Sequence, residues 1–168
     1  YTDYVISHSL MRGLSSTLFA PNQSMTRGMM VTTLYRLAGE PQVEGTATFQ
    51  DVKSSAYYAN AVAWAEANGI AKGIDTGVFA PNAPVTREQA AAFAYRYVTA
   101  YLGKTPAPGA SLGGFQDAGL VSDYAAESLS WAHAAGLMVG YGDGFLGPKD
   151  TVTRAQMAKL LTLLAQNF

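Results

Sequence analysis

A threonine–arginine pair occurs three times in the 168-residue chain, as Thr26-Arg27, Thr86-Arg87 and Thr153-Arg154. Each pair stands before apolar residues at helical spacing, so the threonine can cap a helix by accepting from a backbone N–H. Gln89 and Gln156 follow their threonines at the spacing of a capping box. The arginine then falls on the first helical residue, where the helix dipole disfavours an exposed cation by about 0.3–1 kcal/mol.

A cation placed three times at an unfavourable position needs a reason, and the residues offer two. One is an internal ion pair, with Asp51 or Asp117 as the carboxylate. The other is an anion site, because a helix N-terminus and a guanidinium group together suit a carboxylate or a phosphate. The spacing alone favours neither.

The threonine–arginine pairs belong to an internal repeat. The stretches that end in a pair have the same length and share a glycine start, an aromatic residue and a proline; they are Gly13–Arg27, Gly73–Arg87 and Gly140–Arg154. Phe-Gln-Asp precedes the second and third, at 49–51 and 115–117, and is missing before the first. The chain therefore divides into repeats at 1–40, 49–103 and 115–168, the first truncated at its front, with Gly- and Pro-rich linkers between them.

Each repeat is predicted to contain two helices joined by a loop. Residues 55–68 and 122–135 are rich in alanine and end before a glycine, and a second periodic stretch follows each threonine–arginine pair. Phe19, Phe79 and Phe145 are expected in the core. Two short helices cannot bury their apolar faces alone, so the three repeats must share a core in one compact all-α unit.

Composition excludes several classes of protein. The net charge is −1, which argues against nucleic acid as a partner, and there is no cysteine for a disulfide or a thiolate metal site. No apolar run approaches the length of a membrane span, and the first residues do not form a signal peptide. No nucleophile elbow, phosphate loop or metal-ligand motif is present, so neither an enzyme nor a cofactor or metal site is predicted.

The repeats resemble a triplet of S-layer homology modules over essentially the whole chain. The residues that carry the resemblance are the Phe-Gln-Asp start, the helix with Trp64 or Trp131, the Phe-and-Pro loop and the tetrapeptides TRGM (26–29), TREQ (86–89) and TRAQ (153–156). The resemblance implies a three-pronged spindle of pseudo-threefold symmetry, in which each module gives one helix to a central bundle.

The resemblance also implies a function at the bacterial cell surface. Such triplets anchor exported proteins to the cell wall by binding an acidic secondary cell wall polysaccharide, often pyruvylated, in grooves between the prongs. On this basis the ligand-binding residues are expected to be the motif arginines with their threonines and glutamines, namely Arg27, Arg87, Arg154, Thr26, Thr86, Thr153, Gln89 and Gln156. The alternatives are a protein-interaction or self-assembly module that binds neighbouring surface-layer subunits, and the anchor part of a larger surface enzyme.

This chain departs from the family pattern because none of its tetrapeptides ends in glutamate. Gln89 and Gln156 keep the capping geometry, whereas Met29 cannot and Gly28 weakens the first helical turn. We therefore expect Arg27 to mark the weakest of the three sites.

Four further residues form a second tier of candidates. Lys72 and Arg12 occupy one repeat position beside the loop and could assist an acidic sugar, although a solvated surface charge is the more common role of such residues. Trp64 and Trp131 also share a repeat position and could stack on a sugar ring, but their helical spacing favours the core.

Overall fold

The computed structural model describes residues 1–15 and 17–168, and in these residues it contains helices and no strands. The α-helices are α1 (Thr2–Ser7), α2 (Arg27–Leu37), α3 (Ala59–Ala67), α4 (Arg87–Arg96), α5 (Ala126–Ala134) and α6 (Arg154–Asn167). A π-helical turn, Tyr97–Tyr101, extends α4, and two 3₁₀ turns, η2 (Ala118–Leu120) and η3 (Asp123–Ala125), precede α5. The all-α prediction is confirmed.

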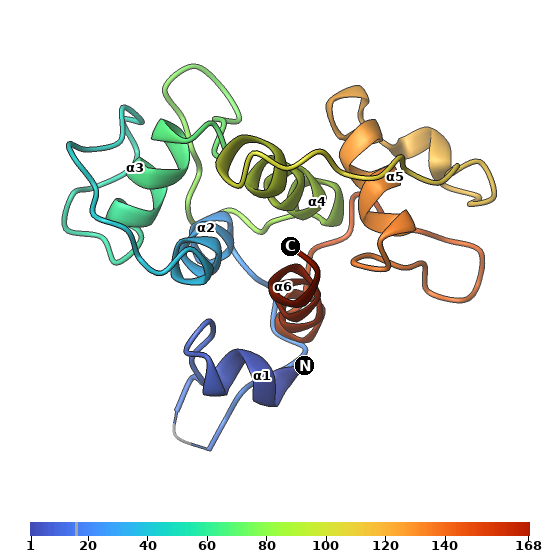
Figure 1. Cartoon of the computed structure of the whole chain (residues 1–168), viewed down its shortest axis with the longest axis horizontal. Helices are drawn as coiled ribbons and strands as arrows, with labels where there is room; N and C mark the ends of the chain where they lie inside the picture. The colour runs from blue at the N-terminus through green and yellow to red at the C-terminus, as the bar shows by residue number, and fades with distance from the viewer. Residues whose placement is uncertain (16) are drawn as a thin grey trace.

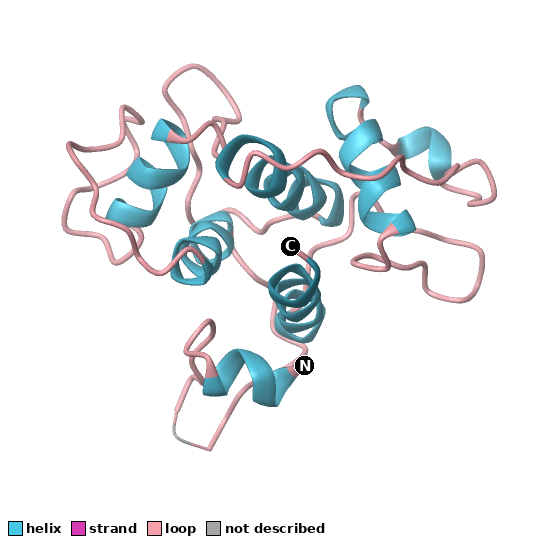
Figure 2. Ribbon diagram, viewed as in Figure 1, coloured by secondary structure: helices cyan, strands magenta, loops and turns pink. Residues whose placement is uncertain are grey.

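The helices that follow the threonine–arginine pairs, α2, α4 and α6, lie at the middle of the molecule, and α1, α3 and α5 lie outside them in three directions (Figure 1). Loops make up most of the outer parts (Figure 2). One buried core includes residues from all three repeats, for example Met30, Phe93 and Leu161. The sharing of one core by the repeats is as expected from helices this short.

Each outer helix packs on the central helix of a neighbouring repeat. Helix α3 of the second repeat packs against α2 of the first, α5 packs against α4, and α1 packs against α6. Trp64 on α3 accordingly contacts the ring of Tyr35 on α2, with ring centroids 5.4 Å apart. A packed unit therefore combines two repeats, so the sequence repeat is not a separate structural unit.

The outer helices begin later than the alanine-rich stretches suggest. Helix α3 starts at Ala59 and α5 at Ala126, while residues 54–58 and 122–125 form turns. Their predicted ends are right, because each helix ends before a glycine with positive φ, at Gly69 (+70°) and Gly136 (+69°). No helix of the described residues is long and apolar enough to cross a membrane.

The expectation that Phe145 is a core residue is wrong. Phe145 is 42% exposed, and Leu146, at 0%, occupies the position that Phe79 holds in the second repeat. Phe79 is fully buried and Phe19 is half-buried. Leu146 stands six residues after Gly140, as Phe79 does after Gly73, so the loop keeps its register and only the aromatic residue lies one position earlier.

Candidate functional site

The residues immediately before the three central helices are joined in a ring by backbone hydrogen bonds between repeats. The backbone N–H of Met25 donates to Val152, that of Val152 to Val85, and that of Val85 to Met25, at 2.8–2.9 Å. These three residues immediately precede the threonine–arginine pairs and are buried. The ring brings the three pairs close together at the centre of the molecule.

Backbone carbonyls of another repeat occupy the N-terminus of each central helix. In α2 the N–H of Arg27 donates to Ala83 at 2.9 Å, and that of Gly28 to Pro81 at 2.8 Å. The first two N–H groups of α4 and α6 have equivalent partners, which are Asp150 and Pro148 for α4 and Gln23 and Pro21 for α6. The first three N–H groups of each central helix are therefore paired, two with another repeat and the third with the capping threonine, and this part of the anion-site hypothesis is wrong.

Each motif arginine extends from its helix to two carbonyls of the same partner repeat. Arg27 donates from Nε to the carbonyl of Phe79 at 2.7 Å and from Nη2 to that of Lys72 at 3.0 Å. The equivalent pairs of acceptors are Leu146 and Val139 for Arg87, and Phe19 and Arg12 for Arg154. The guanidinium groups thus link repeat one to two, two to three, and three to one.

The three arginines are almost fully buried, with 4–6% of their surface exposed. Arg27 and Arg154 lie over the rings of Phe79 and Phe19, and Arg87 lies over that of Tyr141, at 4.6–4.8 Å. Burial lowers the pKa of each guanidinium, which nevertheless stays protonated at neutral pH. The favourable carbonyl and ring contacts explain why a cation is tolerated at the start of these helices.

The alternative of an ion pair with Asp51 or Asp117 is also wrong. Asp51 accepts from the backbone N–H groups of Phe79 and Ala80, at 2.9 and 2.7 Å. Asp117 accepts from Leu146 and Gly147, at 2.9 and 2.8 Å. Each aspartate therefore fixes the loop whose carbonyl receives an arginine, and within the described residues it makes no direct ion pair with that arginine.

The capping boxes of α4 and α6 are present. Thr86 accepts from the N–H of Gln89 at 3.3 Å, and Gln89 accepts from the N–H of Thr86 at 3.1 Å. Thr153 and Gln156 do the same. Thr26 also accepts from the N–H of Met29. The thioether side chain of Met29 does not complete a capping box, as the sequence predicts.

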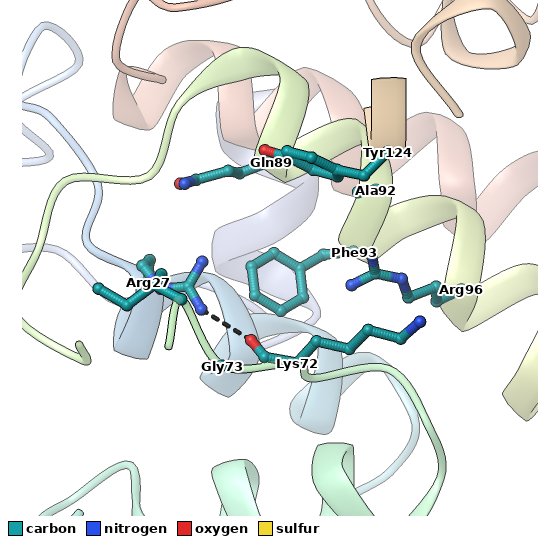
Figure 3. Close-up of a pocket in the computed structure, with 9 residues that line it drawn as sticks. Arg27, Lys72, Gly73, Gln89, Ala92, Phe93, Arg96 and Tyr124 are labelled. Atoms are coloured by element: carbon teal, nitrogen blue, oxygen red, sulfur yellow. Dashed lines mark hydrogen bonds between the residues drawn. The ribbon is translucent and has the colours of Figure 1, made fainter. Parts of the chain in front are cut away.

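The largest groove beside a motif arginine encloses about 420 Å³ next to Arg27. Its lining residues come from all three repeats and are Arg27, Lys72, Gly73, Ile74, Gln89, Ala92, Phe93, Arg96 and Tyr124. Figure 3 shows Arg27 and Lys72 on one side, Gln89 and Tyr124 on the other, and the ring of Phe93 between them. The lining holds three cations and no carboxylate.

Arg154 and Arg87 line grooves at the equivalent positions, but these two grooves differ from the Arg27 groove in volume and in lining residues. The groove of Arg154 encloses about 160 Å³ and includes Arg12, Arg36 and Tyr57, with methionines 11, 25 and 29. The groove of Arg87 encloses about 110 Å³ and includes Val139, Tyr141, Gln156 and Lys159. Lys72, Arg12 and Val139 share one repeat position, so the third groove lacks the cation that this position supplies in the other two.

Each tetrapeptide contributes to two grooves. Arg87 lies in one groove, whereas Gln89, two residues later, lies in the groove of Arg27. Met29 likewise lies with Arg154 and not with Arg27. The ranking that placed Arg27 last used Met29, Gly28 and the missing Phe-Gln-Asp segment. Of these, Met29 belongs to the Arg154 groove, and the ranking itself stays a prediction.

Trp64 and Trp131 do not line these grooves. They are 3% and 2% exposed, and they pack against the rings of Tyr35 and Tyr95. Neither indole therefore offers a face to a sugar. Lys72 and Arg12, in contrast, are exposed and lie in grooves.

Arg96 and Tyr124 also line the Arg27 groove, although neither was predicted to. Both were open to detection, because alignment of the repeats pairs Arg96 with Arg36 and Tyr124 with Tyr57, and all four line grooves. The signal was therefore an arginine and a tyrosine that recur at fixed distances from the threonine–arginine pair.

The S-layer homology domain family matches residues 48–91 and 114–158, which make up a little over half of the chain. The chain therefore belongs to the S-layer homology domain family, as the resemblance in its sequence predicts.

Three relatives are similar over almost the whole chain. An endoglucanase of Bacillus sp. (strain KSM-635) is 34% identical over 98% of the chain and 17% of its own length. An amylopullulanase of Thermoanaerobacterium thermosulfurigenes is 31% identical over 95% of the chain and 8% of its own length. The surface-layer 125 kDa protein of Lysinibacillus sphaericus is 30% identical over 97% of the chain and 14% of its own length. The chain thus spans less than a fifth of each relative.

Proposed function

We propose that this chain is a non-catalytic anchor that holds an exported protein at the bacterial cell surface by binding an acidic cell wall polysaccharide. The observation that carries the proposal is the Arg27 groove, where Arg27, Lys72 and Arg96 line one hollow that has no carboxylate in its lining. Three cations in one hollow suit an anionic group, and the neighbouring Tyr124 and Gln89 suit the ring and hydroxyls of a sugar.

The relatives support an anchoring role because they share this region although their names describe different kinds of protein. Two are named as polysaccharide-degrading enzymes and one as a surface-layer protein, and in each the matched region is under a fifth of the length. A region common to such different proteins is expected to supply a property other than their catalysis, and we propose that this property is attachment to the cell surface. Anchoring of a larger surface enzyme is therefore one form of the proposed function.

The proposed ligand group is a carboxylate, with the pyruvate ketal of a wall sugar as the expected source. Nε and Nη2 of Arg27 are held by the carbonyls of Phe79 and Lys72, so the guanidinium is fixed before a ligand arrives. Its remaining N–H groups and the Lys72 ammonium group are the donors for a carboxylate. A fixed donor loses less entropy on binding than a mobile one.

We rank the Arg27 groove first among the three. It is the largest, and it combines three cations with Gln89 and Tyr124. The Arg154 groove also has three arginines but is smaller and contains methionines. The Arg87 groove is the smallest and has Val139 in place of the loop cation. Weak binding at more than one groove would add avidity on a repeating polysaccharide.

A pull-down on purified, pyruvylated cell wall sacculi tests the proposal. The variant Lys72→Glu reverses a groove charge without touching an arginine contact, and Lys53→Glu makes the same change at an exposed lysine outside the groove linings. We expect Lys72→Glu to reduce binding and Lys53→Glu to bind like the parent. Removal of the ketal should abolish the difference.

Two results would count against the proposal. Equal binding by Lys72→Glu and the parent would exclude the Arg27 groove as the main site. Binding that is indifferent to the ketal, together with co-sedimentation of a surface-layer protein, would support a protein-interaction module instead.

A further inference from the structure

Glu88 is a buried carboxylate that the anchoring site as described does not use. It is 3% exposed and follows Arg87 in the tetrapeptide TREQ. The corresponding residues in the other repeats are Gly28 and Ala155, which carry no charge. An acidic side chain at this buried position is therefore particular to the second repeat, and it requires partners within the fold.

The partners of Glu88 come from two other segments. Its Oε2 accepts from the backbone N–H of Ser122 at 3.0 Å. Its Oε1 accepts from the hydroxyl of Ser122 at 2.9 Å, from Nζ of Lys149 at 2.6 Å and from the hydroxyl of Tyr124 at 3.3 Å. Lys149 also contacts the hydroxyl of Ser122 at 2.5 Å. The cluster joins α4 to the segment that contains η3.

This cluster determines where Tyr124 lies. Ser122 is the residue before the 3₁₀ turn η3, and it makes no side-chain cap of its own for that turn. Glu88 binds both the backbone and the hydroxyl of Ser122, and it receives the hydroxyl of Tyr124. Tyr124 is 54% exposed and lies on the side of the groove opposite Arg27 (Figure 3). The hydrogen bond to Glu88 fixes the hydroxyl of this exposed side chain.

The charge on Glu88 is neutralised within the cluster. Burial acts to raise its pKa, but the hydrogen bonds from Lys149 and Ser122 outweigh burial and bring the pKa below the ordinary value. Burial, together with the charge of Glu88, raises the pKa of Tyr124 to about 12, so its hydroxyl keeps the proton that it donates. The carboxylate thus holds the tyrosine without presenting a free negative charge to the groove.

The groove of Arg154 offers an internal comparison. Tyr57 occupies the position equivalent to Tyr124, but Gly28 stands where a glutamate would have to be. Residues 54–57 form turns and no 3₁₀ helix, and Tyr57 packs edge-on against the ring of Tyr58, with ring centroids 5.0 Å apart. Of the two equivalent tyrosines, Tyr124 is therefore bound by a carboxylate and Tyr57 is not.

We propose that Glu88 is a positioning residue that holds Tyr124 across the Arg27 groove and thereby raises the affinity of this groove for the acidic glycan. The inference rests on the proposed function. It adds Glu88, which lies outside the groove lining and acts by holding Tyr124, which lies in it. It also explains why the Arg27 groove would differ from the Arg154 groove although both contain a tyrosine and three cations.

A double-mutant cycle tests this role, with the methyl glycoside of pyruvylated N-acetylmannosamine as the probe. We expect Tyr124→Ala to weaken binding about two- to tenfold, the range of an aromatic contact, and Glu88→Ala to weaken it by no more than that. If Glu88 acts through Tyr124, Glu88→Ala should cause no further loss in the Tyr124→Ala protein. An equal loss in both backgrounds, or no loss in either, would overturn the proposal.

A second measurement needs no ligand. A fluorotyrosine placed at position 124 reports the surroundings of that ring by ¹⁹F NMR, and the same label at position 57 is the matched control. We expect Glu88→Ala to move the resonance at 124 towards that of a solvated tyrosine and to leave the resonance at 57 in place. An unchanged resonance at 124 would refute the positioning role.

The two measurements separate the two proposals. If the parent protein does not bind the glycoside, the proposed function fails, and the ¹⁹F experiment still decides whether Glu88 positions Tyr124. Glu88→Ala is expected to fold, because the third repeat has alanine at this position. Should it not fold, Glu88→Gln keeps the volume and one acceptor, and we expect the same displacement of Tyr124 to a smaller degree.

Discussion

Met29 lies in the groove of Arg154 and not in that of Arg27, although a single residue separates it from Arg27. The first residues of each central helix face different directions, so neighbours in the tetrapeptide reach different grooves. A motif read as one site in the sequence is thus divided between two sites in the fold. Predictions about a groove must therefore use the residues that line it in the fold, and not the residues that are adjacent in one tetrapeptide.

Arg27→Ala should destabilise the fold strongly. The substitution leaves the buried carbonyl of Phe79 and the part-buried carbonyl of Lys72 without their donor, and a buried unpaired group costs about 1–3 kcal/mol. We expect the free energy of unfolding, measured in urea, to fall by about 2–5 kcal/mol. Arg12→Ala, at an exposed side chain, should change it by no more than about 0.5 kcal/mol. A normal urea midpoint for Arg27→Ala would contradict the structural role of the arginine.

Gly28→Ala should destabilise the protein although helix propensity predicts a gain of about 1 kcal/mol. A Cβ at this position would lie 3.0 Å from the carbonyl oxygen of Pro81 and 3.0 Å from the ring of Tyr58. We expect a net loss of about 1 kcal/mol from the resulting overpacking. Gly119→Ala, which meets no atom within 4 Å, is the control. Thermal unfolding of both variants decides the sign.

The placement of Leu146 in the core, in contrast to Phe145, can be tested by two alanine variants. Leu146→Ala should cost about 2–5 kcal/mol because the side chain is fully buried. Phe145→Ala should cost less than about 1 kcal/mol because the ring is 42% exposed. Urea unfolding of the two proteins provides the comparison, and a larger loss for Phe145→Ala would contradict the packing described.

Asp117 should make the stability depend on acid pH. Burial acts to raise its pKa, but hydrogen bonds from the backbone of Leu146 and Gly147 outweigh burial and bring the pKa below the ordinary value. The stability it provides is complete above the pKa of an unfolded aspartate, about 4, and is lost as the pH falls through the lower native pKa.

Asp117→Asn removes this dependence on pH. We expect the variant to be less stable than the parent by about 1–3 kcal/mol at pH 7, because an amide cannot accept both hydrogen bonds. The difference should narrow as the pH is lowered below about 4. Urea titrations over this range measure it, and a constant difference at every pH would show that the carboxylate charge is not involved.

The sequence by itself determined the features that depend on local interactions. The repeats, the all-α class, the caps formed by Thr86 and Thr153, and the glycines that end α3 and α5 all follow from residues within a few positions of one another. Family membership was also readable, because it rests on motifs that recur in order along the chain.

Only the tertiary structure decided what the motif arginines contact. Sequence reasoning offered an aspartate or an external anion, whereas the partners are carbonyls more than 40 residues away in another repeat. Every residue has a backbone carbonyl, so the residue types in the sequence do not indicate which carbonyls accept from the arginines. The cluster of Glu88, Ser122, Tyr124 and Lys149 was hidden for a related reason, since its members meet only when α4 packs against the third repeat.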